Sequence, residues 1–210
     1  MERIAKLVTA HDAVCFTNEI YNHIVYDDAE HVPMATLPGM RERMVTINAL
    51  SKTFAVTGWR VGWAVAPPGI TDAIRKVHDF VTVGAPHPLQ AAGAEALMMP
   101  DEYFLSLAGF YRERRDALAA ILRETGIDPV LPQGAYYMMA YISAFGWDDD
   151  IEFCCWLARE IGVAAVPGSS FFRDSAEGRR WVRFCFSKRI KTLQAARERL
   201  LRIKSGRRPA

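Results

Sequence analysis

The chain has 210 residues, of which 50% are hydrophobic and 24% are charged, a composition typical of a soluble globular protein with a real core. The formal net charge of +2 is too small to indicate a nucleic-acid partner. No apolar run approaches the roughly 20 residues that a membrane helix needs, and the first residues resemble neither a signal nor a transit peptide. We therefore expect a cytoplasmic protein with no nucleic-acid or membrane partner.

The cysteines and the basic tail indicate no metal site or special partner. Cys15, Cys154, Cys155 and Cys185 form no CxxC pair and have no closely spaced histidines, so neither a zinc site nor a disulfide framework is predicted. We expect reduced, buried thiols. The basic residues at 202–208 are interpreted as a solvated chain end.

The first half of the chain predicts strands that alternate with helices. Apolar residues at helical spacing predict a helix within the first ten positions, and a short apolar run at 13–16 predicts a buried strand. Further elements are expected as strands at 44–47 and 61–66, helices at 70–80 and 89–99, and a loop at 84–88. This alternation favours an α/β layered fold.

The second half predicts a small α+β domain after one long amphipathic helix at 101–124. The later elements are expected as strands at 134–142, 163–166 and 181–186, and helices at 151–161 and 190–201. We place a domain change within the long helix. The expected domains are therefore 1–105 and 106–210.

The segment ALSKTFAVTGWRVG, from Ala49 to Gly62, is the most informative stretch. Lys52 follows a predicted strand, and Arg60 stands eight residues later in a turn bracketed by glycines. A lysine in a mostly apolar wall can act as a nucleophilic amine that forms an imine, and a nearby arginine can bind a phosphate. An arbitrary lysine and arginine pair, however, lies more commonly on the surface.

This segment closely resembles the pyridoxal-phosphate (PLP) attachment motif of class I and II aminotransferases, the fold-type I family. NEIY at 18–21 stands where the family has Asp-Glu-x-Tyr, and PQGAYY, VPG and WVRF follow in the family's order. YDDAEH at 26–31 looks most like the kynurenine, methionine or aromatic branch. The resemblance implies part of a three-layer α/β/α large domain, then a small α+β domain, in a parent protein that is a homodimer.

The resemblance also implies roles for residues of the cofactor site. Lys52 would carry PLP as a Schiff base and move a proton between the substrate α-carbon and the cofactor's C4′. Arg60, helped by Ser51, would bind the cofactor phosphate, and Tyr21 would donate its phenol to the cofactor's O3′. Asn18 would face the pyridine nitrogen.

The resemblance makes Arg183 the group that binds the substrate α-carboxylate, a task suited to a planar bidentate donor. Strand alternation puts Val182 and Phe184 on one face and Arg183 with Trp181 and Cys185 on the other. Because that second face is mixed, alternation alone leaves open an outward charge on an edge strand.

Two residues depart from the family's pattern. Asn18 replaces an aspartate that keeps the pyridine nitrogen protonated, and Ala49 replaces a serine that binds phosphate in many relatives. We expect Asn18 to slow proton removal, and alternation should point Glu19 to the opposite face. His31 and His87 have no partner spacing and are interpreted as loop residues.

The resemblance implies an aminotransferase that acts on an amino acid and a 2-oxo acid. It covers the C-terminal half of the family, so we expect a truncated chain that is inactive alone and has an exposed sheet edge and apolar face. A carbon–sulfur β-lyase that uses the same lysine remains an alternative. A non-catalytic remnant or interaction fragment is a second alternative, favoured by Asn18 and Ala49.

Overall fold

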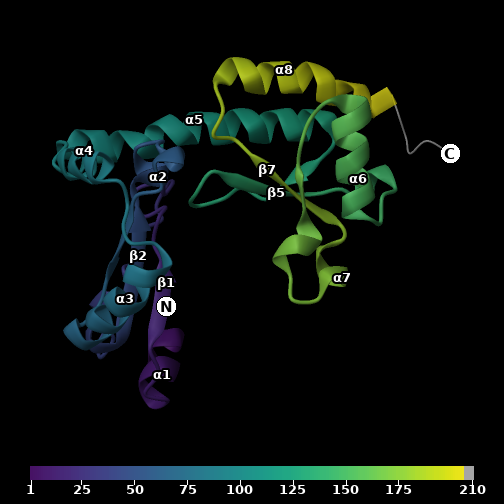
Figure 1. Cartoon of the computed structure of the whole chain (residues 1–210). Helices are drawn as coiled ribbons and strands as arrows, with labels where there is room; N and C mark the ends of the chain where they lie inside the picture. The colour runs from purple at the N-terminus through teal and green to yellow at the C-terminus, as the bar shows by residue number, and fades with distance from the viewer. Residues whose placement is uncertain (206–210) are drawn as a thin grey trace. The chain divides into compact units, whose positions relative to one another are not determined.

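The computed structural model describes residues 1–205, and the chain divides into two compact units, Met1–Leu107 and Ala108–Ala210. Each unit has its own sheet, with three strands in the first and four in the second (Figure 1). The mixed α/β content that the sequence predicts is present. The assignment of residues 1–105 and 106–210 to a large and a small domain stays a prediction.

The first unit alternates helices and strands along the chain, as the sequence predicts. Its elements are α1 (Glu2–Ala10), β1 (Cys15–Asn18), β2 (Met44–Ala49), α2 (Leu50–Thr53), β3 (Gly62–Val65), α3 (Pro68–Val81), α4 (His87–Leu97) and the start of α5 (Asp101–Thr125). The loop predicted at 84–88 ends earlier in the structure than expected. His87 is the first residue of α4, and Pro88 lies in its first turn. A proline is tolerated there, since the first helical residues need no backbone donor.

The strand β2 is the centre of the first sheet. It pairs in parallel with β1, where Asn18 lies opposite Ile47, and antiparallel with β3, where Ala49 lies opposite Gly62. A Cβ atom on Gly62 would lie 2.8 Å from the backbone oxygen of Asn48, so the close approach of β3 to β2 requires glycine. The carboxyl ends of β1 and β2 and the start of β3 therefore lie at one end of the sheet.

The first unit exposes much apolar surface. Phe16 on β1 is 63% exposed and Val65 on β3 is 62% exposed, and both strands are edges of the sheet. Val14 and Phe16 line an apolar groove of about 620 Å³ with Ile74 and Val77 of α3. The expected exposed edge and apolar face are confirmed for this unit. Within residues 1–205, the helices include none long and apolar enough to cross a membrane.

The second unit is built on an antiparallel sheet with the strand order β4-β5-β7-β6. Its elements after α5 are β4 (Asp128–Pro129), β5 (Tyr137–Tyr141), α6 (Asp150–Trp156), β6 (Val166–Pro167), α7 (Ser175–Gly178), β7 (Trp181–Cys185) and α8 (Ile190–Leu200). Figure 1 shows α8 running alongside α5. Leu118 of α5, Phe184 of β7 and Leu193 of α8 line one pocket between these elements.

Two expectations for this unit need correction. The strand predicted at 163–166 is shorter in the structure and begins only at Val166, as β6. Gly162 ends the preceding helix in a left-handed conformation, and the amide of Val163 still donates to the Leu157 carbonyl of that helix. The prediction of a solvated chain end is wrong for Ile203, which is 2% exposed. Arg202 is exposed as expected, although its Nη2 donates to the Ile161 carbonyl at 2.6 Å. Residues 206–208 of that tail lie outside the described residues.

The four cysteines are all free thiols, but they differ in exposure. Cys154 is buried and Cys155 is exposed, so the expectation of buried thiols is wrong for Cys155. Burial, and then the charge of Asp150, raises the pKa of the Cys154 thiol to about 12. Because the thiolate is the nucleophile, Cys154 should be unreactive.

We predict that iodoacetamide at pH 8 modifies Cys155 in the folded chain and leaves Cys154 unmodified. The two cysteines are neighbours, so the variants Cys155→Ser and Cys154→Ser each leave one of them to react. Peptide mass mapping of the two variants then measures the modification of each site. Unfolding in urea should make both sites react. Equal rates at the two sites in the folded chain would contradict the assigned burial.

Candidate functional site

The segments of all five predicted cofactor residues come to one end of the first sheet. Asn18 is the last residue of β1 and Tyr21 lies in the turn after it, while Ser51 and Lys52 lie in α2, directly after β2. Arg60 stands in the turn that leads into β3. Ser51 is 6% exposed and Lys52 is half-buried. Ligands in open α/β sheets bind beyond the carboxyl ends of the strands, so this end is the candidate site.

The short helix α2 is anchored on both sides of its lysine. Leu50, 1% exposed, packs so tightly on α4 that a Cβ atom on Gly93 would lie 2.6 Å from its Cδ1. At the other end, the hydroxyl of Tyr103 donates to the Thr53 carbonyl at 2.7 Å. The ring of Tyr103 also stacks on Phe54, with centroids 5.4 Å apart and planes 5° apart. Burial raises the pKa of Tyr103, so its hydroxyl stays a donor.

The turn after α2 has a strained backbone. Ala55 and Arg60 have φ angles of 56° and 57°, in the left-handed region, which costs about 1–2 kcal/mol for each non-glycine residue. Such strain clusters at functional sites. The hydroxyl of Thr57 donates to the Ser51 carbonyl at 3.1 Å, and Nη1 of Arg60 donates to the Thr57 carbonyl at 3.1 Å. Arg60 lines a groove of about 690 Å³, whose lining does not include Lys52.

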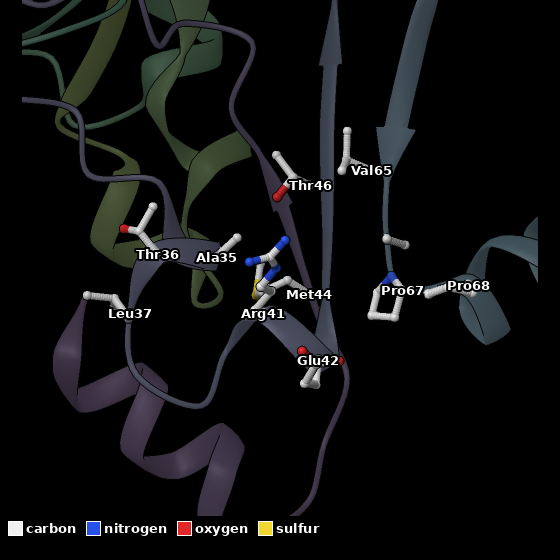
Figure 2. A pocket seen from close by; sticks show the side chains of 11 residues that line it. Ala35, Thr36, Leu37, Arg41, Glu42, Met44, Thr46, Val65, Pro67 and Pro68 are labelled. Carbon is white, nitrogen blue, oxygen red and sulfur yellow. The ribbon is translucent and has the colours of Figure 1, made fainter.

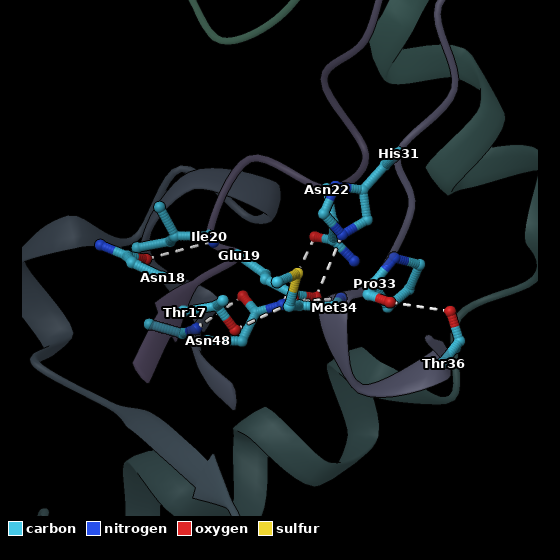
Figure 3. A network of polar contacts seen from close by, with 11 residues as sticks. Thr17, Asn18, Glu19, Ile20, Asn22, His31, Pro33, Met34, Thr36 and Asn48 are labelled. Atoms are coloured by element: carbon cyan, nitrogen blue, oxygen red, sulfur yellow. Dashed lines mark hydrogen bonds and ion pairs between the residues drawn. The ribbon is translucent and has the colours of Figure 1, made fainter. Parts of the chain in front are cut away.

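Glu19 is the centre of a polar network that the sequence did not predict. Its carboxylate accepts hydrogen bonds from the Thr17 hydroxyl at 3.0 Å and the Met34 amide at 3.3 Å, and it pairs with His31 Nε2 at 3.0 Å. Asn18 points away from this network, as Figure 3 shows, and its Oδ1 accepts from the Ile20 amide at 3.3 Å. The expected opposite orientation of Glu19 is confirmed. His31 lies in a loop, as the sequence predicts, and its spacing gave no sign of its partner Glu19.

A second polar link joins the turn after β1 to the end of β2. Nδ2 of Asn48 donates to Oδ1 of Asn22 at 3.4 Å, and Oδ1 of Asn48 accepts from the Ala49 amide at 2.8 Å (Figure 3). Ala49 itself carries no hydroxyl, so this position offers no side-chain donor to a phosphate. The segments that carry Tyr21 and Lys52 are thus tied to each other by side chains as well as by the sheet.

Arg183 lies in the second unit, on β7, which is an interior strand between β5 and β6. The possibility of an outward charge on an edge strand is therefore wrong. Its guanidinium carbon lies 4.1 Å from the ring centroid of Tyr137 and 4.1 Å from that of Phe171. Val182 and Phe184, on the other face, are buried in the core.

Another pocket, of about 850 Å³, lies at the opposite end of the first sheet (Figure 2). It is lined by residues at the start of β2, including Met44, and beyond the end of β3, including Pro67, with Arg41 and Glu42 at its side. None of the predicted site residues lines it. The volume of this pocket is therefore no guide to the chemistry.

Comparison with known proteins places the chain among relatives of one kind. Methionine aminotransferase of Escherichia coli is 38% identical over 196 residues, which are 93% of this chain and 50% of the relative. Kynurenine–oxoglutarate transaminase of Dictyostelium discoideum is 37% identical over 226 residues, 97% of this chain and 52% of the relative. The chain thus spans about half the length of these curated relatives.

The fold gives the same result. The structure of N-succinyldiaminopimelate aminotransferase from Mycobacterium tuberculosis matches with a TM-score of 0.92 at 38% identity, covering 95% of this chain and 52% of that one. Residues 1–200 match the family model described as aminotransferase class I and II. The resemblance seen in the sequence is therefore confirmed, and the chain belongs to the class I and II aminotransferase family.

Proposed function

We propose that this chain serves in a PLP-dependent aminotransferase that moves an amino group between an amino acid and a 2-oxo acid. The observation that carries the proposal is the meeting of three segments at one end of the sheet. They carry Asn18 and Tyr21, Ser51 and Lys52, and Arg60. In the whole protein, the two units would belong to a three-layer large domain and a small α+β domain of a homodimer. This arrangement is supported by the family to which the chain belongs.

The donor set at this end of the sheet fits the cofactor. Lys52 offers an amine for an aldehyde, Ser51 and Arg60 offer a hydroxyl and a guanidinium for a phosphate, Tyr21 offers a phenol for O3′, and Asn18 offers an amide for the pyridine nitrogen. When bound, PLP supplies a ring that accepts the electrons released as the substrate loses its α-proton.

In this mechanism the amine of Lys52 would hold the cofactor and, once substrate is bound, would act as the base that takes the proton from the substrate α-carbon and delivers it to C4′. Its anchors on both sides of α2 restrict where the amine can lie, which favours proton transfer at a defined atom. Arg60 and Ser51 hold the phosphate. Arg183 forks onto the substrate α-carboxylate and thereby orients the α-carbon.

Asn18 weakens one part of this mechanism. A neutral amide can hydrogen-bond the pyridine nitrogen, but it cannot supply the negative charge that keeps this nitrogen protonated. Glu19 is a poor substitute, because its carboxylate is already engaged by Thr17, Met34 and His31 on the other side of the strand. We therefore propose a slow transaminase.

The direct test is an assay of the protein as its gene encodes it. We expect amine transfer from an amino acid such as methionine or kynurenine to 2-oxoglutarate, measured as formation of glutamate that depends on the 2-oxo acid. Release of pyruvate and ammonia from a cysteine conjugate, without transfer, would replace the proposal by the β-lyase. Neither reaction, with PLP bound, would favour a non-catalytic remnant.

We predict that borohydride reduction in the presence of PLP labels Lys52. Lys52 lies on α2 at the candidate site, whereas Lys76 lies on α3 and Lys188 lies between β7 and α8. Absorbance of the bound cofactor and peptide mapping of the reduced protein measure the attachment. Lys52→Ala should abolish both signals, while the matched variants Lys76→Ala and Lys188→Ala should keep them. Labelling that stays on the surface lysines would show that the alignment of this motif is wrong.

We predict that Asn18→Asp increases the rate constant for removal of the substrate α-proton. Each unit by which a carboxylate raises the pKa of the ring nitrogen is worth about 1.4 kcal/mol, or about tenfold in rate. Single-turnover absorbance with α-deuterated and ordinary amino acid isolates this step. Asn22→Asp adds the same charge to the same turn and should give no comparable increase. An unchanged rate in Asn18→Asp would mean that another group serves the nitrogen.

A further inference from the structure

The guanidinium of Arg183 lies close to two aromatic rings, those of Tyr137 and Phe171. Tyr137 lies on β5 and Phe171 lies in the short helical segment Gly168–Phe171, which follows β6. In the strand order β5-β7-β6, the strand of Tyr137 is one neighbour of β7, and the segment of Phe171 follows the other neighbour. Each ring centroid is 4.1 Å from the guanidinium carbon. Stacking at this distance is a cation–π contact.

The in-plane N–H groups are the part of the guanidinium that can bind a carboxylate beside these rings. The five N–H donors of an arginine all lie in the plane of the group, so rings over its faces do not compete with in-plane acceptors. Nε of Arg183 is buried and has no hydrogen-bond partner among the described residues. A buried donor without a partner is unfavourable until an acceptor arrives. Two parallel donors at the edge match a carboxylate.

The backbone of the segment that carries Phe171 is tightly packed, while the Phe171 side chain is 45% exposed. A Cβ atom on Gly168 would lie 2.4 Å from the backbone oxygen of Trp181, so this residue must be glycine. Oδ2 of Asp150, a residue that is 1% exposed, accepts a hydrogen bond from the Ser169 amide at 2.6 Å. The segment is therefore held against the start of β7 before any ligand binds.

We propose that Phe171 and Tyr137 are positioning residues that hold Arg183 edge-on and so set the affinity for the substrate carboxylate. This inference rests on the role that the proposed function gives to Arg183, and it adds the side chains that prepare this arginine. A guanidinium fixed against two rings loses less conformational freedom on binding than a mobile one. The rings thus contribute to carboxylate affinity without touching the carboxylate.

The test is a titration of the purified chain with pyruvate, with neutral pyruvamide as the control for the carboxylate. The NMR signal of Arg183 Nε–H, assigned by its loss in Arg183→Leu, reports binding directly. We expect a saturable shift with pyruvate and none with pyruvamide. Phe171→Leu and Tyr137→Leu should each raise the Kd by about 2- to 30-fold, the range of one cation–π contact.

Matched variants separate positioning from general packing. Phe171→Tyr and Tyr137→Phe keep a ring and should bind pyruvate like the parent chain. Phe172→Leu removes a neighbouring aromatic ring that is 37% exposed and should leave the Kd unchanged. Thermal unfolding of every variant identifies any that do not fold. The two rings lie on different elements, so either Leu variant alone tests the inference.

The outcomes distinguish this inference from the proposed function. If Phe171→Leu and Tyr137→Leu bind pyruvate with the Kd of the parent chain while Arg183→Leu does not bind it, the positioning role is overturned. Arg183 then remains the group that binds the carboxylate. Binding that persists in Arg183→Leu overturns the role of Arg183 itself. No binding to the parent chain overturns a preset carboxylate site, while the transaminase assay still decides the function.

Discussion

The pairing of β2 with β1 on one side and β3 on the other is the constraint on which the candidate cofactor site depends. The ladder continues past the strand ends, because the Glu19 amide donates to the Ile47 carbonyl at 2.9 Å and the Leu50 amide donates to the Val61 carbonyl at 3.2 Å. A slip of one residue would turn every side chain of a strand to the opposite face. The register therefore decides that Asn18 and Glu19 face different surroundings.

Much of the fold could be predicted from the sequence, because apolar runs and helical spacing report burial directly. The errors fall where a single residue changes the backbone rather than the pattern. Gly162 ends a helix and displaces the start of β6, and Pro88 lies in the first turn of α4 instead of extending a loop. Arg202 and Ile203 look like part of a charged tail in sequence, yet Arg202 bonds to the Ile161 carbonyl and Ile203 is buried.

The residues of the candidate site likewise include some that the sequence could predict and some that it could not. Lys52 and Arg60 could be found because their motif is local, but the groups that anchor them are distant in sequence and follow no spacing rule. The Tyr103 hydroxyl reaches Thr53, and His31 reaches Glu19, only because the sheet and α5 bring these segments together. For Arg183, alternation placed it on a mixed face, and only the order of the strands put β7 in the sheet interior.

The anchors of the two key groups lie wholly within separate units. Lys52 is placed by Leu50, Tyr103 and Phe54 in the first unit, and Arg183 is placed by Tyr137 and Phe171 in the second. Effects at sites that share no partners are usually additive. Loosening the rings around Arg183 should therefore weaken carboxylate binding without changing how the cofactor is attached. In the proposed enzyme, attachment of the cofactor and grip on the substrate are thus prepared separately, and each can vary without the other.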